Sequence, residues 1–233
     1  MTDSKYIFFD CMETIVDLYE LPTQSDYALW VFSNSKLEHY WNGFDDFWQK
    51  YSWCRKNISS CLQEHQEYEM KRRIESVVNM TDSINLEIKA DITKKLYMHY
   101  WKTYKSQCYI KPEIKEVLSQ LISKYKLGVV SNFMVKNGIE ELLEINGVSD
   151  YFEFIITSIN IGWRKPNSKI YKSAIENSGC PVEKIIFVGD DIENDYFAPR
   201  RMGMQSIFLD KEGLEVNVER VRDFKELEAK LLG

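Results

Sequence analysis

The chain has 233 residues, of which 44% are hydrophobic and 28% are charged, and this suits a globular protein with one large domain or two modest ones. The formal net charge of −6 argues against a nucleic acid as the main partner, because the chain presents no general basic field. A small phosphorylated ligand remains compatible with this charge, since a metal ion and one or two local cations suffice to hold it.

The first predicted element is a buried strand at residues 6–9. Its four apolar residues are too few for a helix, and Asp10 follows them at once. Ligands bind at the carboxyl ends of strands in an open α/β sheet, so Asp10 is a candidate metal ligand or nucleophile. Thr14 could reach back to the same site with its hydroxyl. A single acid after a strand often only caps a turn. The later strands decide whether Asp10 belongs to a functional site.

Residues 17–107 contain almost no β-type pattern and are predicted to form four or five helices. Five of the six tryptophans lie in this region, and aromatic residues recur at helical spacing over 96–104. We assign most of these aromatics to the core of a helical module inserted just after the first strand. A few of them are available to line a substrate pocket.

Strands and helices alternate in the rest of the chain. Apolar strands are predicted at residues 127–130, 154–156, 184–188 and 206–209. Alternation of this kind indicates a parallel sheet with helices on both faces. We therefore predict an α/β core over residues 1–16 and 108–233, and an all-helical domain over 17–107.

The N-terminal residues and the cysteines indicate a cytoplasmic protein. No apolar signal-type segment precedes the first strand, and no apolar run approaches the roughly 20 residues of a membrane span. The five cysteines are scattered and form no CxxC pair, so we predict neither a zinc site nor a disulfide framework. Reduced thiols of this kind suit the cytoplasm.

Polar side chains follow the predicted strands at their carboxyl ends. They are Asp10 after the first strand, Ser131 and Asn132 after the second, Lys165 in the loop after the third, and Asp190 and Asp191 after the fourth. Because the carboxyl ends of parallel strands meet at one edge of a sheet, we expect these side chains to converge on a single crevice.

Transfer of a phosphoryl group is the chemistry that suits this set. Asp10 and Asp190 offer the hard oxygen ligands that Mg²⁺ prefers. With the phosphate charge neutralised by the metal, Asp10 could attack phosphorus and form an aspartyl phosphate. Ser131 and Lys165 would hold the transferring oxygens. Asp195 could orient Lys165 or a water on the metal.

This arrangement resembles the haloacid dehalogenase superfamily of hydrolases. The four motifs of that family occur here in the family's order, as Asp10 to Thr14, Val129-Val130-Ser131-Asn132, Lys165-Pro166, and Gly189-Asp190 with Asp195 following. The resemblance implies a three-layer Rossmann-like core, with a helical cap between the first and second motifs. It also implies a small phosphorylated substrate and Mg²⁺ as the cofactor.

The resemblance further assigns roles to single residues. The implied catalytic residues are Asp10, Lys165 and Thr14, with Ser131 and Asn132 binding the substrate. The implied metal ligands are Asp10, Asp190 and the backbone carbonyl of Met12, with Asp191, Asp195 and Glu13 in support.

One position departs from the pattern of the family's phosphatases. Their general acid and base is an Asp two residues after the nucleophile, and here that position is Met12, which cannot transfer a proton. The family's dehalogenases also lack this Asp, but they generally work without the metal and lose the acid that this chain keeps as Asp190. Its phosphonate-cleaving enzymes lack the Asp as well, keep the metal and use a cap lysine. The candidate lysines here are Lys36, Lys50 and Lys56.

We favour a Mg²⁺-dependent phosphatase in which Glu13, a cap residue or the leaving group itself supplies the missing proton. A dehalogenase, a phosphonate-cleaving enzyme and a catalytically weak binding or scaffold protein are the alternatives. Neither the identity of the substrate nor the oligomeric state follows from the sequence.

Overall fold

The structure is a computed structural model that describes residues 5–214 and 216–233, and it divides the chain into two compact units. The first unit contains the described residues up to Leu18 and from Tyr109 onward, and the second is Tyr19–Cys108. Among the described residues, no helix combines the length and the apolar character needed to cross a bilayer. All five cysteines are free thiols.

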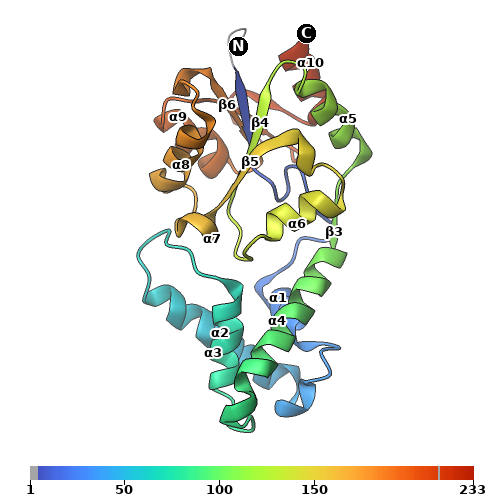
Figure 1. The fold of residues 1–233 in the computed structure, drawn as a ribbon, viewed down its shortest axis with the longest axis vertical. Helices are drawn as coiled ribbons and strands as arrows, with labels where there is room; N and C mark the ends of the chain where they lie inside the picture. Colours follow the sequence, from blue (N-terminus) through green and yellow to red (C-terminus); the bar gives the residue numbers. More distant parts are fainter. Residues whose placement is uncertain (1–4, 215) are drawn as a thin grey trace. The chain divides into compact units, whose positions relative to one another are not determined.

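A six-stranded sheet forms the centre of the first unit, and all its neighbouring strands run parallel (Figure 1). The strand order is β5-β4-β1-β6-β7-β8, with bounds Phe152–Thr157, Lys126–Ser131, Tyr6–Phe9, Ile185–Gly189, Gln205–Leu209 and Arg220–Val221 in that order. Phe9, the last residue of β1, pairs with Val129 of β4 and with Val188 of β6. The three strands therefore end at nearly the same level, and the residues that follow them share one edge of the sheet.

Helices lie between most of these strands and after the last of them. They are α5 (Pro112–Leu121), α6 (Gly138–Ile145), α7 (Ser158–Ile161), α8 (Ser168–Ser178), α9 (Ala198–Arg201) and α10 (Phe224–Leu232), with 3-10 helices at Ser149–Tyr151 and Val182–Lys184 and a π-helical turn at Ile192–Phe197. The predicted alternation of strands and helices is confirmed. The sixth strand, β8, was not predicted, because its two residues are too few to form a pattern.

The sheet is the middle layer of three, as the sequence predicted. Successive side chains of a strand point to opposite faces, and in β1 the side chains of Phe8 and Phe9 do so. Phe8 belongs to a buried cluster with Tyr171 of α8. The ring of Phe9 stacks on Phe224 of α10, with 5.9 Å between the ring centroids, and α10 packs on α5. Helices therefore cover both faces (Figure 1).

The second unit, all of whose residues are described, contains four α-helices. They are α1 (Gln24–Phe32), α2 (Gly43–Ser60), α3 (Met70–Asn79) and α4 (Lys89–Ser106), with 3-10 helices at Glu38–Tyr40 and Leu86–Ile88. Helix α1 contacts α2 and α4, and α3 contacts the same two helices. Buried aromatic side chains fill the centre, as where the rings of Trp41 and Phe47 meet edge to face with 5.0 Å between their centroids. Two further short strands, β2 (Asp17–Leu18) and β3 (Cys108–Tyr109), pair with each other.

Candidate active site

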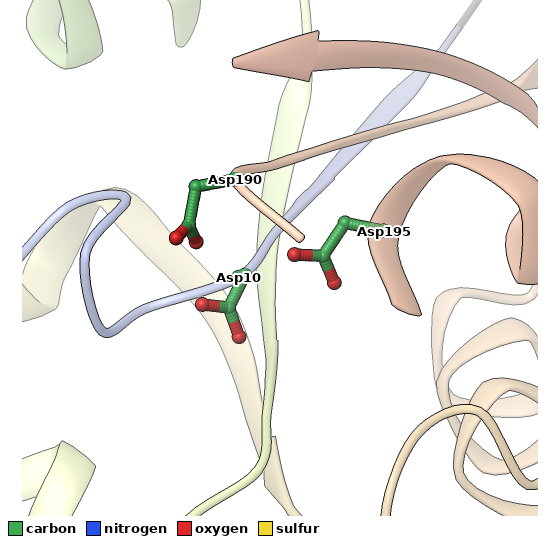
Figure 2. A group of neighbouring side chains, drawn as sticks. All are labelled: Asp10, Asp190 and Asp195. Carbon is green, nitrogen blue, oxygen red and sulfur yellow. The ribbon is translucent and has the colours of Figure 1, made fainter. Parts of the chain in front are cut away.

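Three carboxylates meet at the carboxyl edge of the sheet (Figure 2). Asp10 follows β1, Asp190 follows β6, and Asp195 lies on the π-helical turn that comes next. One oxygen from each carboxylate lies within 4.8 Å of the other two. Asp10 and Asp195 are buried and Asp190 is half-buried. Asp10 and Asp190 come together because β1 and β6 are paired neighbours that end at the same level.

A buried lysine offsets part of this negative charge. Lys165 donates hydrogen bonds from Nζ to Asp10 Oδ1 at 2.6 Å and to Asp195 Oδ1 at 2.7 Å, and its side chain is only 2% exposed. Burial alone would lower the pKa of this amine, but the two carboxylates outweigh burial and raise it. Lys165 is therefore charged at neutral pH. Because Asp10 and Asp195 share it, it offsets one of three negative charges.

Two of the three carboxylates have raised pKa values. Burial, and then the charge of Asp10, raise the pKa of Asp190 to about 6. Burial also raises the pKa of Asp195, against the opposing effect of Lys165. We assign the proton of the Lys165 and Asp195 pair to the lysine, whose ammonium lies between two carboxylates. A divalent cation would relieve the remaining repulsion, and carboxylate oxygens are the hard donors that Mg²⁺ binds. The residues present therefore fit such a metal.

Gly189 allows Asp195 to lie against the end of β6. A Cβ atom on residue 189 would lie 2.3 Å from Asp195 Oδ2 and 2.7 Å from Asp195 Cβ, closer than real Cβ atoms come. Any side chain at this position would displace Asp195 and, with it, the hydrogen bond to Lys165. The glycine of the fourth motif is thus explained by packing.

Two buried hydroxyl groups lie at this edge, and only one of them has a hydrogen-bond partner among the described residues. Thr14, fully buried, donates from Oγ1 to Asp190 Oδ1 at 3.0 Å. Ser131, the last residue of β4, is 1% exposed, and its Oγ has no hydrogen-bond partner among the described residues. Leaving a buried polar group unpaired costs about 1–3 kcal/mol. The Ser131 hydroxyl is therefore available to a ligand.

Asn132 holds the loop that carries Lys165. Its Oδ1 accepts a hydrogen bond from the backbone N–H of Lys165 at 2.7 Å, and its Nδ2 donates to the carbonyl of Lys165 at 3.1 Å. The amide of Asn132 thus fixes the backbone from which the lysine reaches Asp10. Sequence analysis had assigned Asn132 to the substrate, and that role stays a prediction.

A family model described as haloacid dehalogenase-like hydrolase matches residues 7–209, a span that includes the three carboxylates and Lys165. The chain belongs to this family. The resemblance inferred from the four motifs is confirmed, and with it the assignment of the chain to the hydrolases.

Curated relatives of this haloacid dehalogenase-like hydrolase include phosphatases. It is 32% identical over 111 residues to a glyceraldehyde 3-phosphate phosphatase of Methanothermobacter thermautotrophicus, a match that covers 47% of this chain and 49% of the relative. It is 32% identical over 106 residues to the 5-amino-6-(5-phospho-D-ribitylamino)uracil phosphatase YigB of Escherichia coli, covering 46% of this chain and 42% of YigB. The chain thus spans about half the length of the curated relatives it matches.

Solved structures of the same fold match over nearly the whole chain. A 2-haloacid dehalogenase from Pseudomonas syringae pv. Tomato DC3000 has a TM-score of 0.75 at 18% identity, with 98% of each chain covered. The HAD-hydrolase YfnB from Bacillus subtilis, in a magnesium-bound form, has a TM-score of 0.66 at 16% identity, with 99% of each chain covered. At these identities the likeness shows the fold alone.

The loop after Asp10 carries Met12, the departure from the family's phosphatase pattern, and Glu13. Met12 is half-buried and forms a backbone bridge with Val16. Glu13 has a left-handed backbone with φ of 58°, a conformation that glycine adopts more readily than residues with a side chain. Its Oε1 accepts a hydrogen bond from the backbone N–H of Leu18 at 3.2 Å. Burial, and then the charge of Asp17, raise the pKa of Glu13.

Asp191 caps the π-helical turn. It is exposed, and its Oδ1 accepts hydrogen bonds from the backbone N–H groups of Glu193 at 3.0 Å and Asn194 at 2.8 Å. Both bonds are local, as in many caps formed by an Asp side chain. Its predicted supporting role at the metal stays a prediction, and the cap is the contact that the structure shows.

The lysine that follows β7 was not predicted as part of the site. Lys211 follows that strand, and its Nζ lies 2.6 Å from Oδ1 of Asp17, a buried residue to which no role had been assigned. The available signal was a basic residue just after the fifth apolar strand, at the same edge as the other polar side chains. A single lysine after a strand was too common a pattern to be singled out.

Proposed function

We propose that this chain is a Mg²⁺-dependent phosphohydrolase that acts on a small phosphorylated metabolite through an aspartyl intermediate at Asp10. The observation that carries the proposal is the buried contact of Lys165 with Asp10 at 2.6 Å, beside the retained acid Asp190. An intact acid after β6 favours metal-assisted chemistry over metal-free displacement of halide. The phosphatase names of two relatives support the same class.

The reaction starts with attack by the Asp10 carboxylate on phosphorus. An oxygen–phosphorus bond forms to Asp10, and the bond from phosphorus to the leaving oxygen breaks. Water then breaks the aspartyl phosphate and restores Asp10. Asp10, Asp190 and the Met12 carbonyl would hold Mg²⁺, which would supply the positive charge that lets a carboxylate approach a phosphate. Lys165 and the unpaired Ser131 hydroxyl bind the transferring oxygens.

The leaving group receives its proton from a source other than residue 12. Met12 carries no proton that it can donate, and loss of general acid catalysis costs about 10²–10⁴ in rate. Acyl and aryl phosphates have leaving groups that need little protonation, so they are the substrates we expect to react fastest. Glu13 or a residue of the second unit is the proposed donor for poorer leaving groups.

The second unit is proposed to be the cap that selects the substrate. It occupies Tyr19–Cys108, in the interval between the first and second motifs. The five free cysteines favour a reducing compartment, and we place the protein in the cytoplasm.

The experiment is turnover of an aryl phosphate by the full chain, with and without Mg²⁺. We expect phosphate release that requires the metal and that is abolished in Asp10→Asn, which keeps the shape of the side chain but removes the nucleophile. Metal-independent turnover, or equal turnover by Asp10→Asn, contradicts the proposal.

A dehalogenase is the second candidate, and Met12 is the observation that favours it. The same protein is therefore assayed for halide release from a 2-haloacid. Halide release without phosphate release would replace the proposed function. Absence of both activities would favour a binding or scaffold protein.

A further inference from the structure

Asp17 is a buried carboxylate held between two lysines. It lies in β2, is 4% exposed, and ends the segment that follows Asp10. Its Oδ2 lies 3.0 Å from Lys111 Nζ, and its Oδ1 lies 2.6 Å from Lys211 Nζ. Lys111 immediately precedes α5, whereas Lys211 follows β7. Two distant parts of the first unit thus converge on this one side chain.

The segment between Asp10 and Asp17 is tied to itself by short-range hydrogen bonds. The Cys11 carbonyl accepts from the backbone N–H groups of Ile15 at 2.8 Å and Val16 at 2.9 Å. The N–H of Glu13 donates to the Val16 carbonyl at 2.7 Å, and the Glu13 carboxyl accepts from the N–H of Leu18. These hydrogen bonds restrain the segment internally, so we expect a restraint at one end of it to reach the other.

The middle of the segment contacts the carboxylate cluster. Thr14 donates to Asp190 Oδ1 at 3.0 Å. Through Asp17, Lys211 is therefore linked to the segment whose Thr14 contacts the cluster.

We propose that Asp17, held by Lys111 and Lys211, is a positioning residue that fixes the 11–18 segment and thereby orients Thr14 and the Met12 carbonyl toward the reaction centre. The inference rests on the proposed function for its effect on turnover, but the positioning itself is a property of the protein without substrate or metal. The two can therefore be tested separately.

The first test is amide hydrogen exchange of residues 11–18 in the metal-free full chain. The variants are Lys211→Ala and Lys211→Arg, with Lys126→Ala as the matched control, because Lys126 makes a single exposed ion pair with Glu153 at 2.8 Å. We expect faster exchange over 11–18 in Lys211→Ala, near-normal exchange in Lys211→Arg, and no change there in Lys126→Ala. Unchanged exchange in Lys211→Ala overturns the inference. If Lys211→Ala does not fold, Asp17→Asn, which keeps the side-chain shape, replaces it and is expected to show the same faster exchange.

The second test is the kinetics of the same variants with an aryl phosphate. We expect Lys211→Ala to lower kcat and to weaken the response to Mg²⁺ by about 10- to 100-fold, as for other residues that orient metal ligands, with KM nearly unchanged and with rescue by Lys211→Arg. Faster exchange with unchanged kcat would contradict a role in the reaction. If the wild-type protein releases no phosphate, the proposed function fails and the exchange experiment alone decides the positioning.

Discussion

Lys165 Nζ lies 2.6 Å from Asp10 Oδ1, although the two residues are 155 positions apart in the chain. The contact is buried, and it engages one oxygen of the carboxylate and leaves the other available. A charged amine in this position holds the proposed nucleophile in one orientation. A carboxylate held in this way can attack phosphorus with its other oxygen.

Lys165→Met should destabilise the protein strongly, because it keeps the volume of the side chain but leaves two buried carboxylates without their cation. Removing one partner of a buried ion pair costs about 3–5 kcal/mol in the free energy of unfolding. The loss of stability should shrink as the pH falls and Asp195, whose pKa is raised, takes up a proton. Denaturant unfolding at two pH values measures this. Lys126→Met, which breaks an exposed pair, should cost about 0–1 kcal/mol, and an equal cost in the two variants would contradict the account.

Ser131→Ala should make the protein more stable and less active. The Ser131 hydroxyl is buried without a partner, so its removal should raise the free energy of unfolding by about 1 kcal/mol. Loss of a donor to the phosphoryl oxygens should lower kcat by about 10²-fold. Ser206→Ala is the control, because Ser206 in β7 is also buried with an unpaired hydroxyl. The control should gain stability and keep its activity. A loss of activity in both variants would contradict the proposal that the Ser131 hydroxyl binds the phosphoryl oxygens.

The metal-free protein should lose stability as the pH rises toward neutrality. The pKa of Asp190 is raised from 3.8 to about 6, so the folded state binds more protons than the unfolded state between these values. The resulting penalty is absent below the lower value, grows through the interval and is complete above the upper one. This penalty amounts to about 3 kcal/mol.

Thermal unfolding as a function of pH measures this penalty, and Asp190→Asn should flatten the profile of stability against pH. Mg²⁺ should stabilise the protein more above pH 6 than below pH 4. A profile in Asp190→Asn identical to that of the wild type would show that another group is responsible.

Met12→Asp should restore a general acid at the family's usual position. We expect a gain of about 10²-fold in kcat for an alkyl phosphate, whose leaving group needs a proton, and a smaller gain for an aryl phosphate. Steady-state kinetics with both substrates measures the difference. Met12→Asn is the control for shape without acidity and should give no gain. If Met12→Asp is no faster than the wild type with either substrate, the site is built for other chemistry.

The positions of five strands along the chain and the edge at which the site forms could be predicted, because both depend on short-range patterns. Four apolar runs, each ending in a polar residue, are sufficient to place Asp10, Ser131 and Asp190 at neighbouring strand ends of a parallel sheet. The two-residue strand β8 could not be predicted, because it forms by pairing with β7 and carries no pattern of its own.

The partners of single side chains could not be predicted, because they depend on distances between distant parts of the chain. Asn132 follows β4 as expected, but only the folded loop shows that its amide is bonded to the backbone of Lys165. Similarly, the pairing of Lys211 with Asp17 joins residues 194 positions apart. Residue type and strand order indicate which groups gather at an edge, whereas packing decides which of them touch.

The most direct test of the account is to trap the covalent intermediate. The full chain is mixed with Mg²⁺ and an acyl phosphate, quenched in acid during turnover, digested and analysed by mass spectrometry. The account predicts a phosphoryl group on the peptide that contains Asp10, dependent on Mg²⁺ and absent from Asp10→Asn. Rapid turnover with no phosphoryl group on that peptide, or a phosphoryl group on another residue, would contradict it.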